Sequence, residues 1–240
     1  MIKCVIFDYG DTLADSKAAN KKAFTNAPEQ KVLERHGLEF SKKHVQDAFC
    51  EASKKGKALG EKALIKKLFF AKEFLKELGL RPTEKLAQEC ENAYFTEREK
   101  HRKLMPNALE LLKFLKKKGM ILCVITNTRT DSNKKNAKRL GIFKYFKHFI
   151  MSHKVGSVKS ELKIFRHLLE RLNKGRKNKI RSEECLMVGN HAGEDGAAKL
   201  VGMKTAIYTR HLHGKKFLKT LKPDYLVKGL EEIEKIIQES

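Results

Sequence analysis

Residues 3–13 have the sequence KCVIFDYGDTL, and this short segment determines how the rest of the chain is interpreted. Its apolar run over residues 5–7 shows no polar alternation, which is typical of a strand buried on both faces of a parallel sheet. The run ends on Asp8, and a carboxylate is costly to bury without a partner. We therefore expect a buried strand whose carboxyl end carries a functional acid.

Further apolar runs follow the same pattern along the second half of the chain. Strong strand candidates are residues 121–125, 185–188 and 205–208, and weaker ones are residues 148–151 and 225–227. Amphipathic helical stretches lie between them, at residues 108–118, 133–140, 162–172 and 194–200. This alternation predicts an α/β fold, with a Rossmann-like parallel sheet joined by right-handed crossovers.

Residues 15–103 interrupt that alternation. The stretches 28–36, 44–54, 64–78 and 83–102 have helical periodicity with Lys and Glu on their outer faces, and no strand separates them. Pro106 marks the return to the sheet. The pattern predicts an all-helical domain, residues 15–103, inserted after the first strand of a core domain formed by residues 1–14 and 104–240.

The composition limits the class of protein. The 240 residues include 52 Lys and Arg against 29 Asp and Glu, a formal net charge of +23, which attracts anions over a long range. The five cysteines form no C-x-x-C pair and fit small core residues in a reducing compartment. No apolar run suits a signal peptide or a membrane span. We expect a cytoplasmic protein without membrane contact, either a monomer or a homodimer.

Polar side chains stand where the predicted strands end. In an open parallel sheet, ligands gather outside the carboxyl ends of the strands. The residues at this edge are Asp8 after the first strand, Thr126 and Asn127 after the second, Asn190 and Asp195 after the fourth, and Lys159 at the start of a helix. A carboxylate can attack phosphorus, while an ammonium, a hydroxyl, amides and Mg²⁺ can neutralise the phosphoryl oxygens. The residue types therefore suit phosphoryl transfer.

Four segments resemble, in order and spacing, the four motifs of the haloacid dehalogenase-like (HAD) hydrolase superfamily. They are VIFDYGDTL at residues 5–13, VITNT at 124–128, VKSELKIF at 158–165 and VGNHAGEDGAAKLVGMKT at 188–205. The helical insert stands where that family has its helical cap domain. The resemblance implies a hydrolase, and more specifically a Mg²⁺-dependent phosphatase of a small phosphorylated metabolite.

The resemblance also implies a role for each residue. Asp8 would be the nucleophile that forms an aspartyl-phosphate, and Lys159 would orient it and offset its charge. Substrate oxygens would be held by Thr126 and the backbone amide of Asn127, with Thr12 as a further candidate. The implied metal ligands are Asp8, the carbonyl of Gly10, Asn190 and Asp195. A cap of this kind would close over the substrate and exclude water.

Two positions depart from the family pattern. Phosphatases of the family usually carry a second Asp two residues after the nucleophile, as general acid and base, and Gly10 occupies that position. Asp11 is its neighbour, but a shift of one residue in an extended chain points the side chain elsewhere. Asn190 stands where Asp is usual, so the metal site has one carboxylate fewer. These departures predict a slow enzyme, or a substrate with a good leaving group.

Two alternatives remain open. Metal-independent 2-haloacid dehalogenases of the superfamily also lack the second Asp and carry an amide in the last loop, although their loop is shorter than the one from Asn190 to Asp195. A catalytically weak or inactive relative could instead bind an anionic partner such as nucleic acid. That partner is less favoured, because the sequence has no regular basic helix with interleaved aromatics and no zinc spacing.

Overall fold

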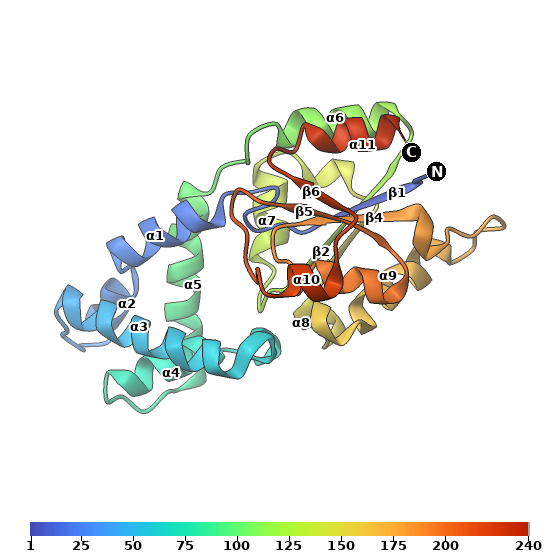
Figure 1. Cartoon of the computed structure of the whole chain (residues 1–240). Helices are drawn as coiled ribbons and strands as arrows, with labels where there is room; N and C mark the ends of the chain where they lie inside the picture. The colour runs from blue at the N-terminus through green and yellow to red at the C-terminus, as the bar shows by residue number, and fades with distance from the viewer. Residues whose placement is uncertain (240) are drawn as a thin grey trace. The chain divides into compact units, whose positions relative to one another are not determined.

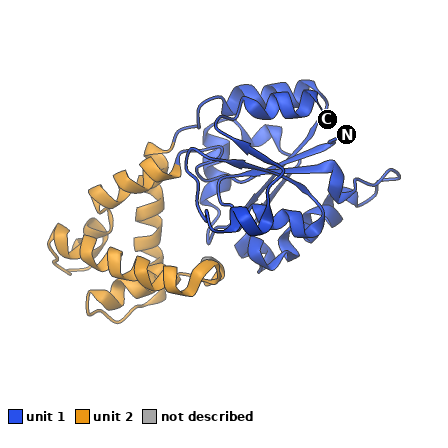
Figure 2. Ribbon diagram, viewed as in Figure 1, with its two compact units in different colours: residues 1–15, 103–240 blue, residues 16–102 orange. Residues whose placement is uncertain are grey.

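The structure of the protein is a computed structural model that describes residues 1–239. It divides into two compact units (Figure 2): an α/β unit formed by residues 1–15 and 103–240, and a helical unit formed by residues 16–102. We describe each unit by itself.

The α/β unit is built on a six-stranded sheet in the order β3-β2-β1-β4-β5-β6, in which every neighbouring pair is parallel. The strands are β1 (Cys4–Phe7), β2 (Ile121–Thr126), β3 (His148–Met151), β4 (Cys185–Gly189), β5 (Lys204–Tyr208) and β6 (Tyr225–Val227). The predicted α/β fold with a parallel sheet is confirmed. β1 lies between β2 and β4, so the first strand of the chain is central.

Alternate residues of β1 enter two separate cores. Val5 and Phe7 pack into one apolar cluster with residues of α6 (Ala108–Lys117), α7 (Ser132–Arg139) and α11 (Glu232–Gln238). Cys4 and Ile6 pack into the other, with α9 (Lys163–Asn173). Figure 1 shows α6 and α11 on one side of the sheet and α9 on the other. Because both faces are covered, the strand sequence is apolar without alternation.

Short elements complete this unit. They are η2 (Phe143–Tyr145), α8 (Ser152–Val155), η3 (Lys159–Glu161), η4 (Ser182–Glu184), η5 (Gly196–Val201) and α10 (Phe217–Leu221). The helix expected over residues 194–200 is the 3-10 helix η5, preceded by a turn that contains Asp195. The expected amphipathic α-helix is therefore wrong at this position, because the chain first folds into the loop at the sheet edge.

The helical unit contains α1 (Ser16–Asn26), α2 (Glu29–Arg35), α3 (Lys42–Leu59), η1 (Gly60–Ile65), α4 (Phe69–Glu77) and α5 (Glu84–His101). Two of these differ from the sequence expectation. α1 was not predicted, because among its apolar residues only two small alanines, Ala19 and Ala23, are buried and leave no strong apolar stripe. The single helix expected over residues 64–78 is interrupted at Leu68, whose φ of 55° is left-handed and ends helical propagation.

Apolar side chains of four helices form the core of the helical unit. It contains Val32 of α2, Val45 of α3, Phe74 and Leu75 of α4, and Cys90 of α5. Full burial of each Leu or Phe side chain stabilises such a core by about 1.5–3 kcal/mol. The side-chain oxygens of Ser41 and Thr83 accept backbone hydrogen bonds from His44 and Leu86, which fixes the first turns of α3 and α5.

One carboxyl group lies in this helical unit with little access to water. Glu29, the first residue of α2, is only 5% exposed, and burial raises its pKa from 4.5 to about 7. Its charge also contributes to the raised pKa of Cys90, about 12, after the larger effect of burial. An acid whose pKa is higher in the folded state binds its proton more tightly there, so stability falls as pH rises through the window from 4.5 to about 7.

We expect Glu29→Gln to stabilise the helical unit above pH 7 and to have little effect at pH 4.5, because the amide removes the cost of burying a charge. The gain at pH 8 should be about 1–3 kcal/mol in the free energy of unfolding. Circular dichroism melts at both pH values, with hydrogen exchange in α2 and α5, measure it. The control is Glu34→Gln, an exposed acid of the same helix. Equal pH profiles for the two variants would contradict the prediction.

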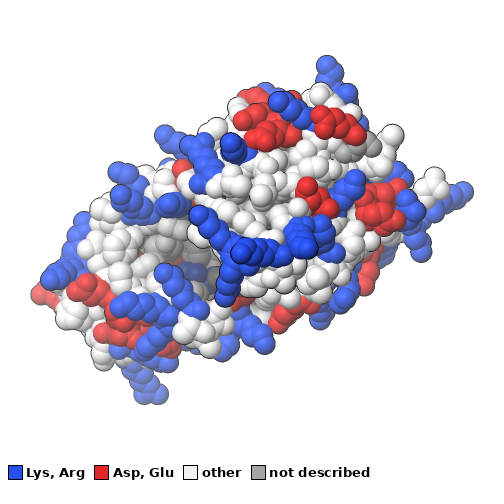
Figure 3. All heavy atoms as spheres, viewed as in Figure 1, with Lys and Arg blue, Asp and Glu red and all other residues white. Residues whose placement is uncertain are grey.

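The surface carries the positive charge predicted from the composition. Figure 3 shows Lys and Arg side chains scattered across the visible face, while Asp and Glu gather in a few smaller groups. Among the described residues, no helix combines the length and the apolar composition needed to cross a membrane.

Candidate active site

Asp8 is fixed at the carboxyl edge of the sheet by the pairing of β1. Its backbone N–H donates to the carbonyl of Val188 at 2.8 Å, which extends the β1–β4 ladder one residue beyond Phe7. A tight turn follows, in which the N–H groups of Leu13 and Ala14 donate to the carbonyl of Tyr9 at 3.1 and 3.0 Å. The chain therefore reverses directly after Asp8 and keeps this carboxylate at the end of the central strand.

Lys159 joins Asp8 to Asp195. Its Nζ donates to Asp8 Oδ1 at 2.5 Å and to Asp195 Oδ1 at 2.6 Å. The side chains of Lys159 and Asp195 are each 1% exposed, and that of Asp8 is 12% exposed. Motifs 36 and 151 residues away from Lys159 therefore meet in one buried cluster of two carboxylates and one ammonium.

Burial has opposite consequences for the acid and the base of this cluster. It raises the pKa of Asp8 from 3.8 to about 6, although the charge of Lys159 lowers it, and the Asp195 charge adds to the rise. Burial also favours neutral Lys159, but the charges of Asp195 and Asp8 outweigh that effect and raise its pKa above the ordinary 10.5. Lys159 is therefore a permanent cation, and it lowers the cost of ionising the buried Asp8.

The second oxygen of Asp195 is also engaged. Oδ2 accepts a hydrogen bond from the backbone N–H of His191 at 2.8 Å, within the loop that follows β4. Gly189 passes so close that a Cβ atom there would lie 2.1 Å from Asp195 Oδ2. A glycine at the end of β4 is therefore required for the buried position of this carboxylate.

Asn127 connects Lys159 to the loop after β4. Its Oδ1 accepts from the backbone N–H of Lys159 at 3.1 Å, and its Nδ2 donates to Glu194 Oε2 at 2.7 Å. The neighbouring Thr126 has a buried hydroxyl that accepts from Asn133 Nδ2 at 2.9 Å. The sequence indicated only the backbone amide of Asn127 as functional, whereas its side chain positions two of the site's segments.

Asn190 and Thr12 form a second polar pair. Asn190 Nδ2 donates to the carbonyl of His211 at 2.8 Å, and Oδ1 accepts from the Thr12 hydroxyl at 3.3 Å. Both residues are buried, so the amide is oriented with its oxygen toward Thr12. Gly10 lies in the turn after Asp8, where it forms a bridge with Ala14. The structure thus unites Asp8, Lys159 and Asp195 through their side chains and connects Asn127 to the backbone of Lys159. Thr126, Thr12, Asn190 and Gly10 lie in other hydrogen-bonded pairs and turns.

Sequence reasoning missed the segment at residues 211–213. Beyond the bond from Asn190 to His211, the N–H of His213 donates to the carbonyl of Asn190 at 2.9 Å, and its carbonyl accepts from Ala192 at 2.9 Å. This segment therefore supports the loop that carries Asn190, although His213 is exposed. Backbone pairing of this kind leaves no periodic signal in the sequence.

The donor chemistry of the site fits a hard cation. Within residues 1–239, no three His, Cys, Asp or Glu side chains come close enough to form a metal site. The oxygen atoms at this edge that could bind a cation are of three types: the Asp8 carboxylate, the Asn190 amide oxygen and the backbone carbonyl of Gly10. Magnesium accepts such oxygens and keeps several waters. Both oxygens of Asp195 accept hydrogen bonds, whereas the hydrogen bonds that Asp8 and Asn190 accept from side chains of the described residues engage only Oδ1 of each, so such a site would have few anionic ligands.

Comparison with known proteins defines the class. Residues 2–202 match the haloacid dehalogenase-like hydrolase family, so the chain belongs to this family of hydrolases. Among curated proteins, glyceraldehyde 3-phosphate phosphatase of Pyrococcus abyssi is 31% identical over 209 residues, covering 85% of this chain and 80% of that protein. Together with the family match, this identifies the chain as a HAD-family enzyme with phosphatases among its relatives.

Solved structures share the fold at lower identity. The HAD-hydrolase YfnB of Bacillus subtilis, in a form bound to magnesium, has a TM-score of 0.69 at 21% identity, covering 99% of each chain. A 2-haloacid dehalogenase from Pseudomonas syringae pv. Tomato has a TM-score of 0.71 at 22% identity, covering 100% of this chain and 99% of that one. This fold therefore occurs both in a magnesium-bound hydrolase and in a dehalogenase, so the function has to be argued from the residues of the site and not from the fold.

Proposed function

We propose that this enzyme is a Mg²⁺-dependent phosphatase that uses Asp8 as its nucleophile. The observation that carries the proposal is the buried bridge from Lys159 to Asp8 and Asp195, with distances of 2.5 and 2.6 Å. The proposed substrate is a small sugar phosphate of the triose class. The relative from Pyrococcus abyssi, named glyceraldehyde 3-phosphate phosphatase, supports that class. We further expect the enzyme to act in the cytoplasm.

The proposed reaction has two displacements at phosphorus. An oxygen of Asp8 forms a bond to phosphorus while the bond from phosphorus to the ester oxygen breaks, which leaves an aspartyl-phosphate and an alkoxide that takes a proton from water. A water molecule then attacks the same phosphorus and restores Asp8, releasing inorganic phosphate. Lys159 offsets negative charge throughout, and the Thr126 hydroxyl and Asn127 amide would bind phosphoryl oxygens.

Magnesium would be held by Asp8, Asn190 and the carbonyl of Gly10, and would neutralise phosphoryl charge. Asp195 would act mainly through Lys159, since its two oxygens accept from Lys159 and from the His191 N–H. The helical unit would serve as the cap that excludes water during the reaction. With Gly10 in place of an acid, proton transfer to the leaving group relies on water, which costs about 10²–10⁴-fold in rate.

The test is release of inorganic phosphate from glyceraldehyde 3-phosphate, other small phosphate esters and an activated aryl phosphate, with Mg²⁺ and with EDTA. We expect turnover only with Mg²⁺. The aryl phosphate should react faster than alkyl esters of similar size, because its leaving group needs no general acid. Absence of phosphate release from every ester in Mg²⁺ would refute the proposal.

A second candidate is metal-independent dehalogenation, in which Asp8 attacks carbon. The specific observation in its favour is that Asn190 brings an amide and Asp195 is already hydrogen-bonded through both oxygens, which leaves Asp8 as the available carboxylate. Chloride release from 2-chloropropionate in EDTA, without phosphate release from esters in Mg²⁺, would establish this candidate in place of the phosphatase.

A further inference from the structure

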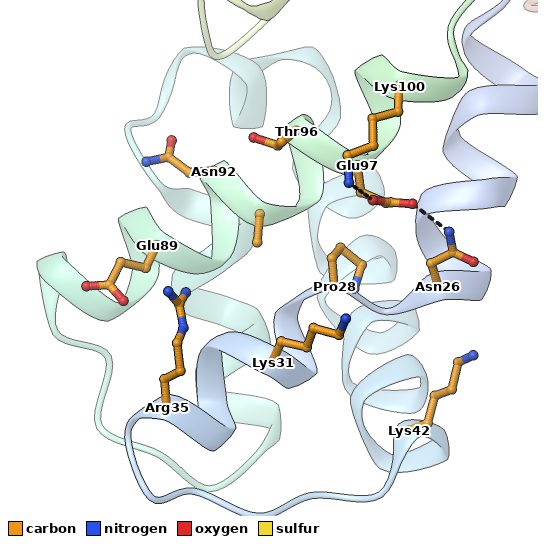
Figure 4. A pocket seen from close by; sticks show the side chains of 11 residues that line it. Asn26, Pro28, Lys31, Arg35, Lys42, Glu89, Asn92, Thr96, Glu97 and Lys100 are labelled. Carbon is orange, nitrogen blue, oxygen red and sulfur yellow. Dashed lines mark hydrogen bonds and ion pairs between the residues drawn. The ribbon is translucent and has the colours of Figure 1, made fainter.

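An open, polar hollow of about 740 Å³ lies on the surface of the helical unit and is built from that unit alone (Figure 4). It is lined by Asn26, Pro28, Lys31, Arg35, Lys42, Glu89, Asn92, Ala93, Thr96, Glu97 and Lys100. None of these residues belongs to the site at the edge of the sheet.

The hollow forms between the polar faces of α2 and α5. Lys31 and Arg35 are four residues apart and therefore share one face of α2, whereas Val32 and Leu33 of the same helix are buried in the core. The residues of α5 that line the hollow recur at helical spacing from Glu89 to Lys100, so they form one stripe along that helix. Short side chains in this stripe, Ala93 and Thr96 among them, leave space that the core does not fill.

The two carboxylates of the hollow already have side-chain partners. Glu97 accepts from Lys100 at 2.8 Å, from Asn26 at 2.6 Å and from His101 at 3.0 Å, and these bonds lower its pKa to about 2. Glu89 contacts His36 at 2.9 Å. Figure 4 shows Glu97 between Lys100 and Asn26, with both contacts drawn. Neither acid is therefore an open site for a cation.

Three cations of the hollow have no such partner. Across residues 1–239, Lys31, Arg35 and Lys42 make neither an ion pair nor a side-chain hydrogen bond, although the charge of Arg35 adds slightly to the lowered pKa of Glu89. Figure 4 shows Arg35 extending from α2 toward α5. Three positive charges without an ion-pair partner, set around one concave surface, attract a polyanion, and Glu89 offsets only part of the charge of Arg35. The amide of Asn92 and the hydroxyl of Thr96 add neutral hydrogen-bonding groups.

We propose that this hollow is a second ligand site, which binds a small metabolite carrying two phosphate groups on a hydroxylated carbon chain, such as a sugar bisphosphate. Two phosphates at about −1.5 to −2 each match the three cations. The volume lies in the ordinary range for small-molecule sites. Amide and hydroxyl groups suit sugar hydroxyls, and no aromatic ring lines the hollow for a nucleotide base to stack upon.

Isothermal titration of fructose 1,6-bisphosphate into the full-length Asp8→Asn protein tests the site without interference from turnover. Lys31→Gln/Arg35→Gln should weaken binding by about tenfold or more, because two charge-assisted contacts are lost. The matched control is Lys43→Gln/Lys57→Gln, which removes the same charge from exposed positions of α3 outside the hollow and should leave the affinity unchanged.

Because the two double variants carry the same net charge, a difference in their affinities for the bisphosphate can come only from a local binding site. Equal affinities for the two doubles, or no binding of the bisphosphate to the parent protein, would overturn the proposal. Tighter binding of ADP than of the bisphosphate would overturn the assigned ligand class. Because the titration measures binding and not phosphate release, its failure is distinct from failure of the proposed phosphatase activity.

Discussion

Asp8→Asn should abolish turnover, with a loss of roughly 10³-fold or more in kcat, because an amide cannot form the covalent intermediate. The substitution keeps the size of the side chain and removes one of two carboxylates bonded to Lys159, so the protein should remain folded. Lys159 keeps its bond to Asp195 at 2.6 Å. Steady-state phosphate release in Mg²⁺, together with circular dichroism to verify folding, provides the measurement.

Asp11→Asn is the matched control for that experiment. Asp11 is the neighbouring acid in the same turn, and its φ of 57° is in the left-handed region, where Asn is as well tolerated as Asp. The same chemical change three residues along the chain should alter kcat by less than about tenfold. If Asp11→Asn is as damaging as Asp8→Asn, or if Asp8→Asn retains activity, then Asp8 is not the nucleophile.

The sheet could be predicted because buried parallel strands have a strong local signature. The runs around Ile6 and Val124 are apolar on both faces, and all six strands fall where apolar runs stand in the sequence. The helix predictions were wrong where the pattern of apolar residues is weak. α1 buries only small side chains among its apolar residues, and the break at Leu68 depends on a left-handed backbone angle that Leu does not signal.

The candidate active site could likewise be predicted only in part. Order and spacing of the motifs pointed to Asp8, Lys159 and Asp195, which the structure brings within hydrogen-bonding distance. The sequence could not indicate that the side chain of Asn127 connects Lys159 with Glu194, since an Asn after a strand has several possible partners. The sequence also could not predict that residues 211–213 support the loop after β4, because this contact depends on backbone groups that every residue possesses.

Lys159→Met should destabilise the α/β unit and remove activity together. The substitution preserves volume but leaves Asp8 and Asp195 buried without their common cation, and breaking a buried ion pair in this way costs about 3–5 kcal/mol. Without the charge of Lys159, which lowers the pKa of Asp8, that pKa should rise above its present value of about 6. Urea denaturation at pH 8 and pH 5, followed by circular dichroism, measures the loss.

The pH dependence identifies the cause of that loss. The folded-state pKa of Asp8 lies above its ordinary value of 3.8, so the folded protein binds this proton more tightly, and stability declines as pH rises through the folded pKa. The Lys159→Met variant should therefore be much less destabilised at pH 5, where the Asp8 carboxyl group is protonated, than at pH 8. Lys154→Met is the control, because Lys154 is exposed and lies 3.5 Å from Asp131. A pH-independent loss would indicate poor packing of the introduced methionine side chain, whereas equal stability of the two variants would show that the buried carboxylates do not need Lys159.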